Sequence, residues 1–231
     1  MDDPDYHNRI DRHRQSELSE IILGGQDGLV NVLGVLLGVA GATQQTRFVL
    51  AAGIAAAVAE SLSMAAVAYT ATEARRAHYR SELERERRHL ERVPEIERDE
   101  VREIFRRKGF TGDLLERIVE TITANHEVWL ALMMTEEHRL HPDQGRSGRA
   151  ALVVGVSSAV GSLVPLFPYL VLPIGPALWA SLALSAATLF SVGAYKAITT
   201  VGHWLRSGLE LAAIGMVTAA AGYGIGLLFQ P

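Results

Sequence analysis

The sequence contains no cysteine among its 231 residues. Disulfide bridges and thiolate metal sites are therefore excluded, and any metal site must use carboxylates, histidine, methionine or backbone oxygen. An excess of positive charge is also lacking, because the formal net charge is −4. This balance argues against a nucleic-acid partner.

Most of the charged residues lie in one stretch of the chain. Of the 26 acidic residues, 17 lie between residues 73 and 143, and 15 of the 22 Lys and Arg residues lie between residues 75 and 146. The remainder is rich in Ala, Gly, Leu and Val. This segregation is typical of a membrane protein that carries one charged insert.

The uncharged parts contain five apolar stretches, each at least ~20 residues long and therefore able to cross the ~30 Å hydrocarbon core as a helix. Buried helices of a soluble protein are the alternative, but five such stretches in a chain of this length argue against it. No strand signal and no internal repeat is present. The sequence thus predicts an all-α polytopic membrane protein with spans at residues 21–42, 48–71, 150–172, 174–198 and 209–229.

The charged insert divides the chain into three parts, at residues 1–71, 72–149 and 150–231. Lys and Arg flank the predicted spans mainly on the side of the N-terminus and the insert, whereas Arg47 alone lies on the other side. Because positive residues favour the cytosolic side, we expect the N-terminus and the insert to be cytosolic. A short chain rich in Ala and Arg favours a bacterial inner membrane over a vacuolar membrane.

The insert is predicted to be helical throughout. No Gly or Pro interrupts residues 72–93, so the second span should continue out of the membrane as one long helix. Pro94 ends this helix and suits the first turn of the next, which should run over about residues 95–108 and stop at Gly109. Thr111 or Asp113 could cap a third helical segment, which should end near Leu140.

Two acidic residues lie inside the predicted spans, Asp27 in the first and Glu60 in the second. Charged groups at this depth are costly and usually functional. Met64 lies four residues after Glu60 and therefore on the same helical face. Carboxylates with a thioether suit Fe²⁺ or a later metal, and an acid in a low dielectric can also exchange a proton for the metal. Packing of Met64 and a structural role for each acid are the alternatives.

Small residues recur at four-residue spacing within the spans, which lets helices approach closely. We expect tight packing, and the same pattern is compatible with a homodimer. The pairs are Gly24 with Gly28, Gly34 with Gly38, and Gly222 with Gly226.

Possible metal ligands also gather in the insert, where a turn at Pro94 could bring several of them together. Each pair lies on one face of its helix, and the set offers oxygen, nitrogen and sulfur donors, which suit ions such as Fe²⁺. A solvated hairpin with many Arg–Glu pairs is the alternative. The pairs are Glu86 with His89, Glu97 with Glu100, and Met133 with Glu137.

Several motifs resemble those of the vacuolar iron transporter family. Residues 27–31 (DGLVN) look like its DGLV signature, and residues 63–66 (SMAA) look like its SMA signature. Residues 161–169 and 205–209 resemble its third span and the lead into its fifth. The resemblance covers nearly the whole chain and agrees with the predicted topology.

The resemblance implies a homodimer with a metal path along the two-fold axis and proton-coupled export of Fe²⁺, with Mn²⁺, Co²⁺ or Zn²⁺ as further possible ions. Asp27 and Met64 match translocation-path positions, and Glu20 matches an acid at the cytosolic entrance. The six insert residues named above match the family's metal-binding helices.

Two positions depart from the family pattern. Val67 and Ala68 stand where the family often has Gly-Glu, and Glu60 is the acid that could compensate. His89 stands where the family usually has Glu.

Two other functions remain open on the sequence. A membrane-anchored di-iron oxidase would use Glu86-x-x-His89, but such sites need a second motif of this kind and two further acids. A metal buffer that transports nothing would explain the insert but not Asp27 and Glu60. The sequence therefore favours a transporter that is not an enzyme.

Overall fold

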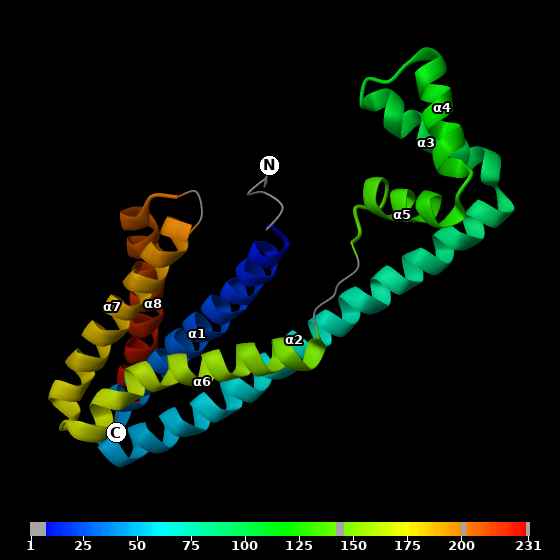
Figure 1. Cartoon of the computed structure of the whole chain (residues 1–231). Coiled ribbons are helices and arrows are strands. Elements are labelled where there is room, and N and C mark those ends of the chain that lie inside the picture. Colours follow the sequence, from blue (N-terminus) through cyan, green and yellow to red (C-terminus); the bar gives the residue numbers. More distant parts are fainter. Residues whose placement is uncertain (1–7, 142–145, 200–201, 230–231) are drawn as a thin grey trace. The chain divides into compact units, whose positions relative to one another are not determined.

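The computed structural model describes residues 8–141, 146–199 and 202–229. Within these ranges the chain forms helices and no strand, which confirms the predicted all-α class (Figure 1). The helices are α1 (Asn8–Thr43), α2 (Thr46–Arg92), α3 (Pro94–Arg107), α4 (Gly112–Thr123), α5 (His126–Glu136), α6 (Ser147–Val171), α7 (Ile174–Thr199) and α8 (Trp204–Leu228).

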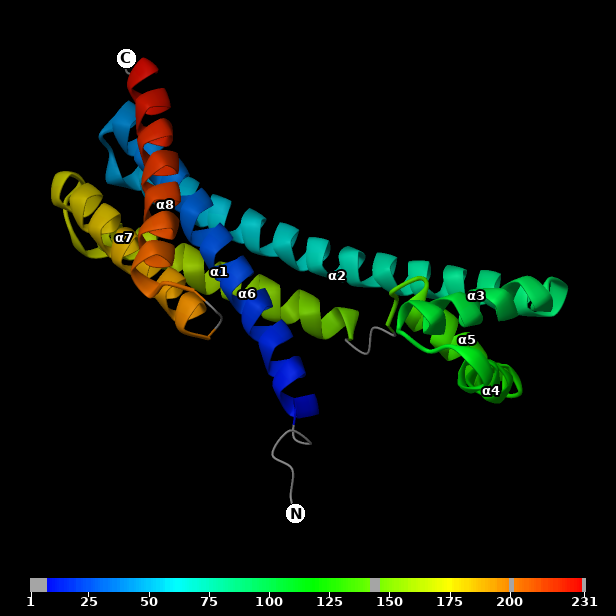
Figure 2. The same ribbon diagram turned by 90° about the horizontal axis from the view of Figure 1, so that it is seen from above.

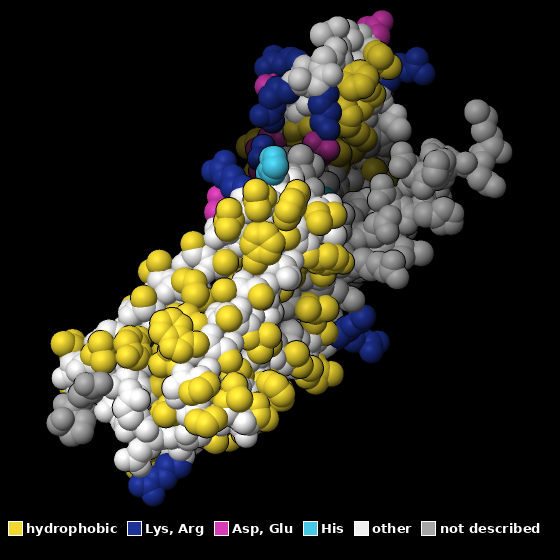
Figure 3. Space-filling view, turned by 90° about the vertical axis from the view of Figure 1, so that its left-hand side faces the viewer, with side chains coloured by type: hydrophobic (Ala, Val, Ile, Leu, Met, Phe, Trp, Pro, Cys, Tyr) yellow, Lys and Arg dark blue, Asp and Glu magenta, His cyan; other side chains and the backbone are white. Residues whose placement is uncertain are grey.

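Five of these helices are long and apolar enough to cross a membrane: α1 from Leu18, α2, α6, α7 and α8. They correspond to the five predicted spans, so the chain is an integral membrane protein. Hydrophobic side chains cover most of the visible face of the spanning helices, and Lys and Arg gather at its margins (Figure 3).

The chain divides into two compact units, and α2 contributes to both of them. The first comprises Met1–Tyr69 and Arg146–Pro231 and is called here the spanning unit. The second, Thr70–Gly145, is called the insert. As predicted, α2 continues without a break to Arg92, since neither Gly nor Pro occurs in its part after residue 71.

Helix α1 is the central element of the spanning unit and packs along α6, α8 and α7 (Figures 1 and 2). One side of α1 places Val32 and Leu36 in a core with residues of α2, α6 and α7. The neighbouring side places Leu33 and Leu37 against Ala219 of α8. All four α1 side chains are fully buried.

The three glycine pairs are used for contacts within the chain. A Cβ atom on Gly28 would collide with the carbonyl oxygen of Ser158 in α6. In α8, a Cβ on Gly222 or Gly226 would collide with the carbonyl oxygen of Gly34 or Gly38 respectively. The expectation of tight packing is confirmed, and these faces of α1 and α8 are occupied inside one chain.

The insert begins as predicted. Pro94 is the first residue of α3, and the chain turns after this helix at Gly109, whose φ of +96° is easily adopted by glycine. The prediction of a single third helix is wrong, since α4 ends at Thr123 and α5 begins at His126. The cause is Asn125, whose side-chain oxygen accepts hydrogen bonds from the backbone of Glu127 and Val128 and caps α5.

The four helical segments of the insert enclose one hydrophobic core. Its members come from the end of α2 and from α3, α4 and α5: Leu90, Val101, Ile104, Leu115, Val119, Trp129, Leu130 and Met133.

The contact between α1 and α6 yields a stability prediction. Gly161→Ala would place a Cβ against the backbone of Gly25 in α1, where no side chain can move aside. We expect a loss of about 2 kcal/mol or more, measured as a lower melting temperature of the purified protein in detergent.

Gly148→Ala is the matched control for this substitution. Gly148 lies in the first turn of the same helix, with nothing within 4 Å of the added Cβ. The control should melt at or slightly above the parent temperature. Equal stability of the Gly161→Ala variant and its parent would contradict the packing described.

Candidate metal sites in the spans and in the insert

The two acids of the spans are brought together. The side chain of Glu60 on α2 interacts with the carboxyl group of Asp27 on α1, and also with the side chain of Asn31. Asp27 and Glu60 are both half-buried. They lie about equally far from the turn that joins α1 to α2, which is why antiparallel packing places them at one level.

The other predicted residues of the spans flank this pair. Met64 lies one helical turn beyond Glu60 and is half-buried. Glu20 lies about two turns before Asp27 on α1 and is also half-buried. Asn31 was not predicted as a site residue, although its spacing of four from Asp27 puts both on one face of α1.

A second cluster of acids and histidines lies within the insert. Three groups each present one possible ligand atom per residue, and within a group these atoms lie within 4.8 Å of one another. The groups share members, so the structure joins them into one cluster. They are Glu86 with Glu137 and His138, Glu86 with His89 and Glu97, and Glu97 with Glu100 and Glu137.

Two acids of this cluster are withdrawn from water. Glu86 is 2% exposed and Glu97 is 3% exposed. Each keeps one buried carboxylate oxygen, Oε1 of Glu86 and Oε2 of Glu97, with no hydrogen-bond partner in the described part of the chain. Because an unpaired buried oxygen is costly, these atoms fit a site that receives a cation or a proton.

Burial and the closeness of the acids change the pKa values of two members of the cluster. Burial, together with the negative charges of Glu86 and Glu100, raises the pKa of Glu97 to about 8. Burial and the neighbouring Glu100 also raise the pKa of Glu137. Near neutral pH the empty cluster therefore retains protons, and a divalent cation would have to displace them.

Two histidines contact the buried acids. Nδ1 of His89 lies 3.3 Å from Oε1 of Glu97, and Nε2 of His138 lies 3.0 Å from Oε2 of Glu86. The sequence did not indicate His138 as a site residue. It lies in the turn after α5, where Arg139 has a φ of +54°, so helical periodicity could not predict its direction.

Met133 lies in a different environment from the acids. Its side chain is fully buried in the hydrophobic core of the insert, and its carbonyl oxygen accepts hydrogen bonds from the backbone of Glu137 and His138. Met133 thus helps to hold the turn that carries these two residues. Its role as a sulfur ligand stays a prediction.

A family model described as the VIT family matches residues 18–227. The chain belongs to the VIT family, as the sequence motifs predicted. Curated VIT relatives align over nearly their whole length. Vacuolar iron transporter 1 of Eucalyptus grandis is 32% identical, over 96% of this chain and 92% of the relative.

Two further VIT relatives come from other organisms. Vacuolar iron transporter 1 of Arabidopsis thaliana is 31% identical, over 99% of this chain and 94% of the relative. The vacuolar iron transporter of Plasmodium falciparum is 25% identical, over 98% of this chain and 89% of the relative. The similarity therefore includes both the spans and the insert.

The raised pKa of Glu97 predicts a pH-dependent stability of the metal-free protein. The folded state holds a proton up to about pH 8, whereas the unfolded state loses it near pH 4.5, so stability falls as pH rises between these values. Glu97→Gln removes this dependence. At pH 8.5 we expect the variant to melt about 5 °C above the parent, a shift of roughly 1 kcal/mol for a unit of this size.

Fluorescence of Trp129, which is buried in the core of the insert, reports this unfolding when Trp179 and Trp204 are replaced by Phe and a chelator is present. Near pH 4.5 the Glu97→Gln variant and the parent should melt together. Glu120→Gln changes an exposed acid of α4 and should behave like the parent at both pH values. An unchanged pH slope in Glu97→Gln would contradict the assignment.

Proposed function

We propose that this protein exports divalent transition-metal ions, Fe²⁺ foremost, from the cytosol across its membrane in exchange for protons. The observation that carries the proposal is the contact between Asp27 and Glu60 inside the spanning helices. The VIT relatives are named vacuolar iron transporters, and these names indicate iron as the transported metal.

The contact has a direct chemical consequence. A charged side chain at the centre of a membrane costs about 3 kcal/mol by insertion scales, and two adjacent carboxylates also repel each other. Either protons or one divalent cation can neutralise the pair. The same two acids can therefore carry metal in one direction and protons in the other.

The donor set favours a transition metal over Mg²⁺ or Ca²⁺. Carboxylates alone suit hard ions, whereas the thioether of Met64, one turn from Glu60, adds a soft donor. The amide of Asn31 donates a hydrogen bond to Glu60 and thus helps to hold this carboxylate beside Asp27. Fe²⁺ accepts this mixture, and Mn²⁺, Co²⁺ and Zn²⁺ are the other ions to compare with it.

The insert would serve as the site of capture. Its buried acids, two of whose oxygens have no hydrogen-bond partner in the described ranges, would gather a cation from the cytosol. The cation would then pass to Glu20 and on to Asp27, Met64 and Glu60. The distribution of Lys and Arg supports a cytosolic insert. The relatives bear vacuolar names, whereas composition alone favours a bacterial inner membrane for this chain.

A homodimer is part of the proposal. Of the most apolar segment of α2, which carries Glu60, 11% is buried within the chain, against 44% for α1 and for α6. A second copy packed on α2 would enclose the Asp27–Glu60 pair between two protomers. The glycine pairs do not support such an interface, because they are used within the chain.

Asp27→Asn tests the path. The substitution keeps the shape of the side chain but removes a charged ligand, and we expect metal flux to fall about tenfold or more. The assay uses liposomes that contain the purified protein and a metal-sensitive dye, with Fe²⁺ or Mn²⁺ added outside and a proton gradient of either sign. Parent flux should increase when protons can move in the opposite direction.

Glu210→Gln is the matched control for this test, since Glu210 is an exposed acid of α8 that pairs with Arg206. It should transport like the parent. Normal flux in a folded Asp27→Asn variant would refute the proposed path. Metal binding without flux in the parent would instead indicate a buffer.

A double substitution in the insert tests capture. Glu97→Ala with Glu100→Ala removes two neighbouring acids of the cluster, so Mn²⁺ affinity should fall at least tenfold while some transport persists at high metal concentration. Calorimetry on the full-length protein measures the affinity. Glu120→Ala with Glu127→Ala removes two exposed acids outside the cluster and should change little. Equal Mn²⁺ affinity in the two double variants would count against capture by the cluster.

A further inference from the structure

We infer that His138 is a direct metal ligand of the insert and sets which ions it prefers. The inference rests on the proposed capture function and adds a residue to it. His138 lies outside the set that the sequence motifs identify, and its assignment comes from the geometry around Glu86.

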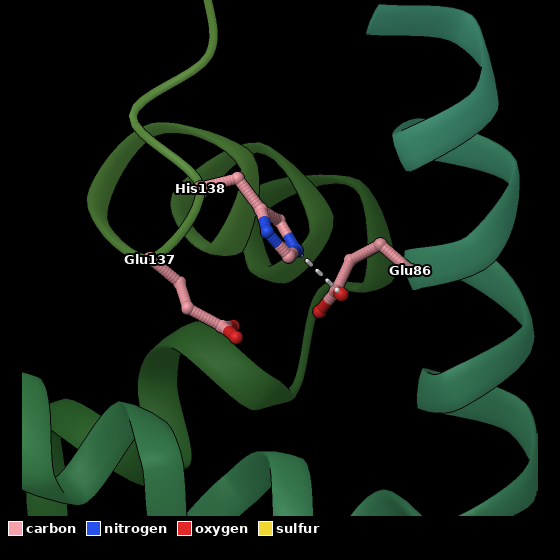
Figure 4. Close-up of side chains that lie close together, drawn as sticks. All are labelled: Glu86, Glu137 and His138. Carbon is pink, nitrogen blue, oxygen red and sulfur yellow. Dashed lines mark hydrogen bonds and ion pairs between the residues drawn. The ribbon is translucent and has the colours of Figure 1, made fainter. Parts of the chain in front are cut away.

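The ring of His138 and the carboxylate of Glu137 both project from the turn after α5 toward Glu86 on α2 (Figure 4). Nε2 of His138 lies 3.0 Å from Oε2 of Glu86, and one ligand atom from each of the three residues lies within 4.8 Å of the others. Ligands bound to one ion at about 2.1 Å lie roughly 3.0 to 3.4 Å apart. A cation therefore fits among these three side chains with small adjustments.

The second observation is the state of Glu86 itself. Its side chain is 2% exposed, and Oε1 has no hydrogen-bond partner in the described structure while Oε2 is bound by His138. The His138 side chain is 14% exposed. A buried oxygen without a partner, beside a nearly buried imidazole, is the arrangement that a bound cation would complete.

The same acid also belongs to a second group of possible ligands. Glu86, His89 and Glu97 form this second group, in which the nitrogen donor comes from α2. His89 is 49% exposed and thus more accessible to solvent than His138. The cluster therefore contains two imidazoles, and that of His138 is the more buried.

Whether a ligand atom is nitrogen or oxygen determines which metal ions it favours. Imidazole nitrogen binds Co²⁺ and Zn²⁺ better than Mn²⁺, whereas carboxylates bind Mn²⁺ well. Loss of His138 should therefore weaken the late ions more than Mn²⁺. A residue that only holds Glu86 in place would affect all ions alike.

His138→Gln separates these roles, because an amide can still donate a hydrogen bond to Glu86 but is a poor ligand for late metals. We would titrate the full-length protein in detergent with Co²⁺ alone and with Mn²⁺ alone. The expected result is a Co²⁺ affinity about tenfold lower and a Mn²⁺ affinity changed less than about threefold. His141→Gln, an exposed histidine outside the three groups, should match the parent.

A spectroscopic test does not require a His138 variant. In His89→Gln, pulsed electron paramagnetic resonance of bound Mn²⁺ should still detect coupling to an imidazole nitrogen. Absence of that coupling would overturn the inference, as would parental Co²⁺ affinity in His138→Gln. In both cases normal metal binding by the parent would leave the capture function intact. A parent protein that binds neither ion would overturn the capture function together with the role of His138.

Discussion

A carboxylate removed from water must find either a proton or a cation, and both candidate sites depend on this constraint. In the spans, Asp27 and Glu60 share one location among apolar helices. In the insert, Glu86 and Glu97 each bury an oxygen that has no hydrogen-bond partner among the described residues, and burial with the neighbouring acids raises the pKa of Glu97 to about 8. The fold thus places poorly solvated carboxylates at two sites, and either protons or a divalent ion would stabilise them there.

The packing of α1 explains why the intramembrane acids meet. Gly28 follows Asp27 directly and contacts the backbone of α6 at Ser158, which fixes the rotation of α1 about its own axis. With that face against α6, Asp27 is directed to α2 and Glu60. The small residues of a membrane helix thus determine where its charged residue points.

Much of this arrangement could be predicted from the sequence because it depends on local patterns. Apolar length predicted the five spans, and the absence of Gly and Pro from residues 72–93 predicted that α2 continues beyond its span. The break at Asn125 was missed because a single capping side chain outweighed a continuous helical pattern. His138 was missed for a related reason, since a turn directs its side chain and only tertiary structure fixes that turn.

The glycine contacts of α1 also have a mechanical consequence. Where backbone touches backbone, no side-chain rotamer can absorb a change in spacing, so α1, α6 and α8 form a stiff block. The apolar part of α2, of which 11% is buried, shares less surface with that block and meets α6 closely at Gly155, where an added Cβ would lie 3.2 Å from the carbonyl oxygen of Ser61. If the two acids separate during a transport cycle, a movement of α2 about this contact would displace Glu60, while Asp27 would stay with the block.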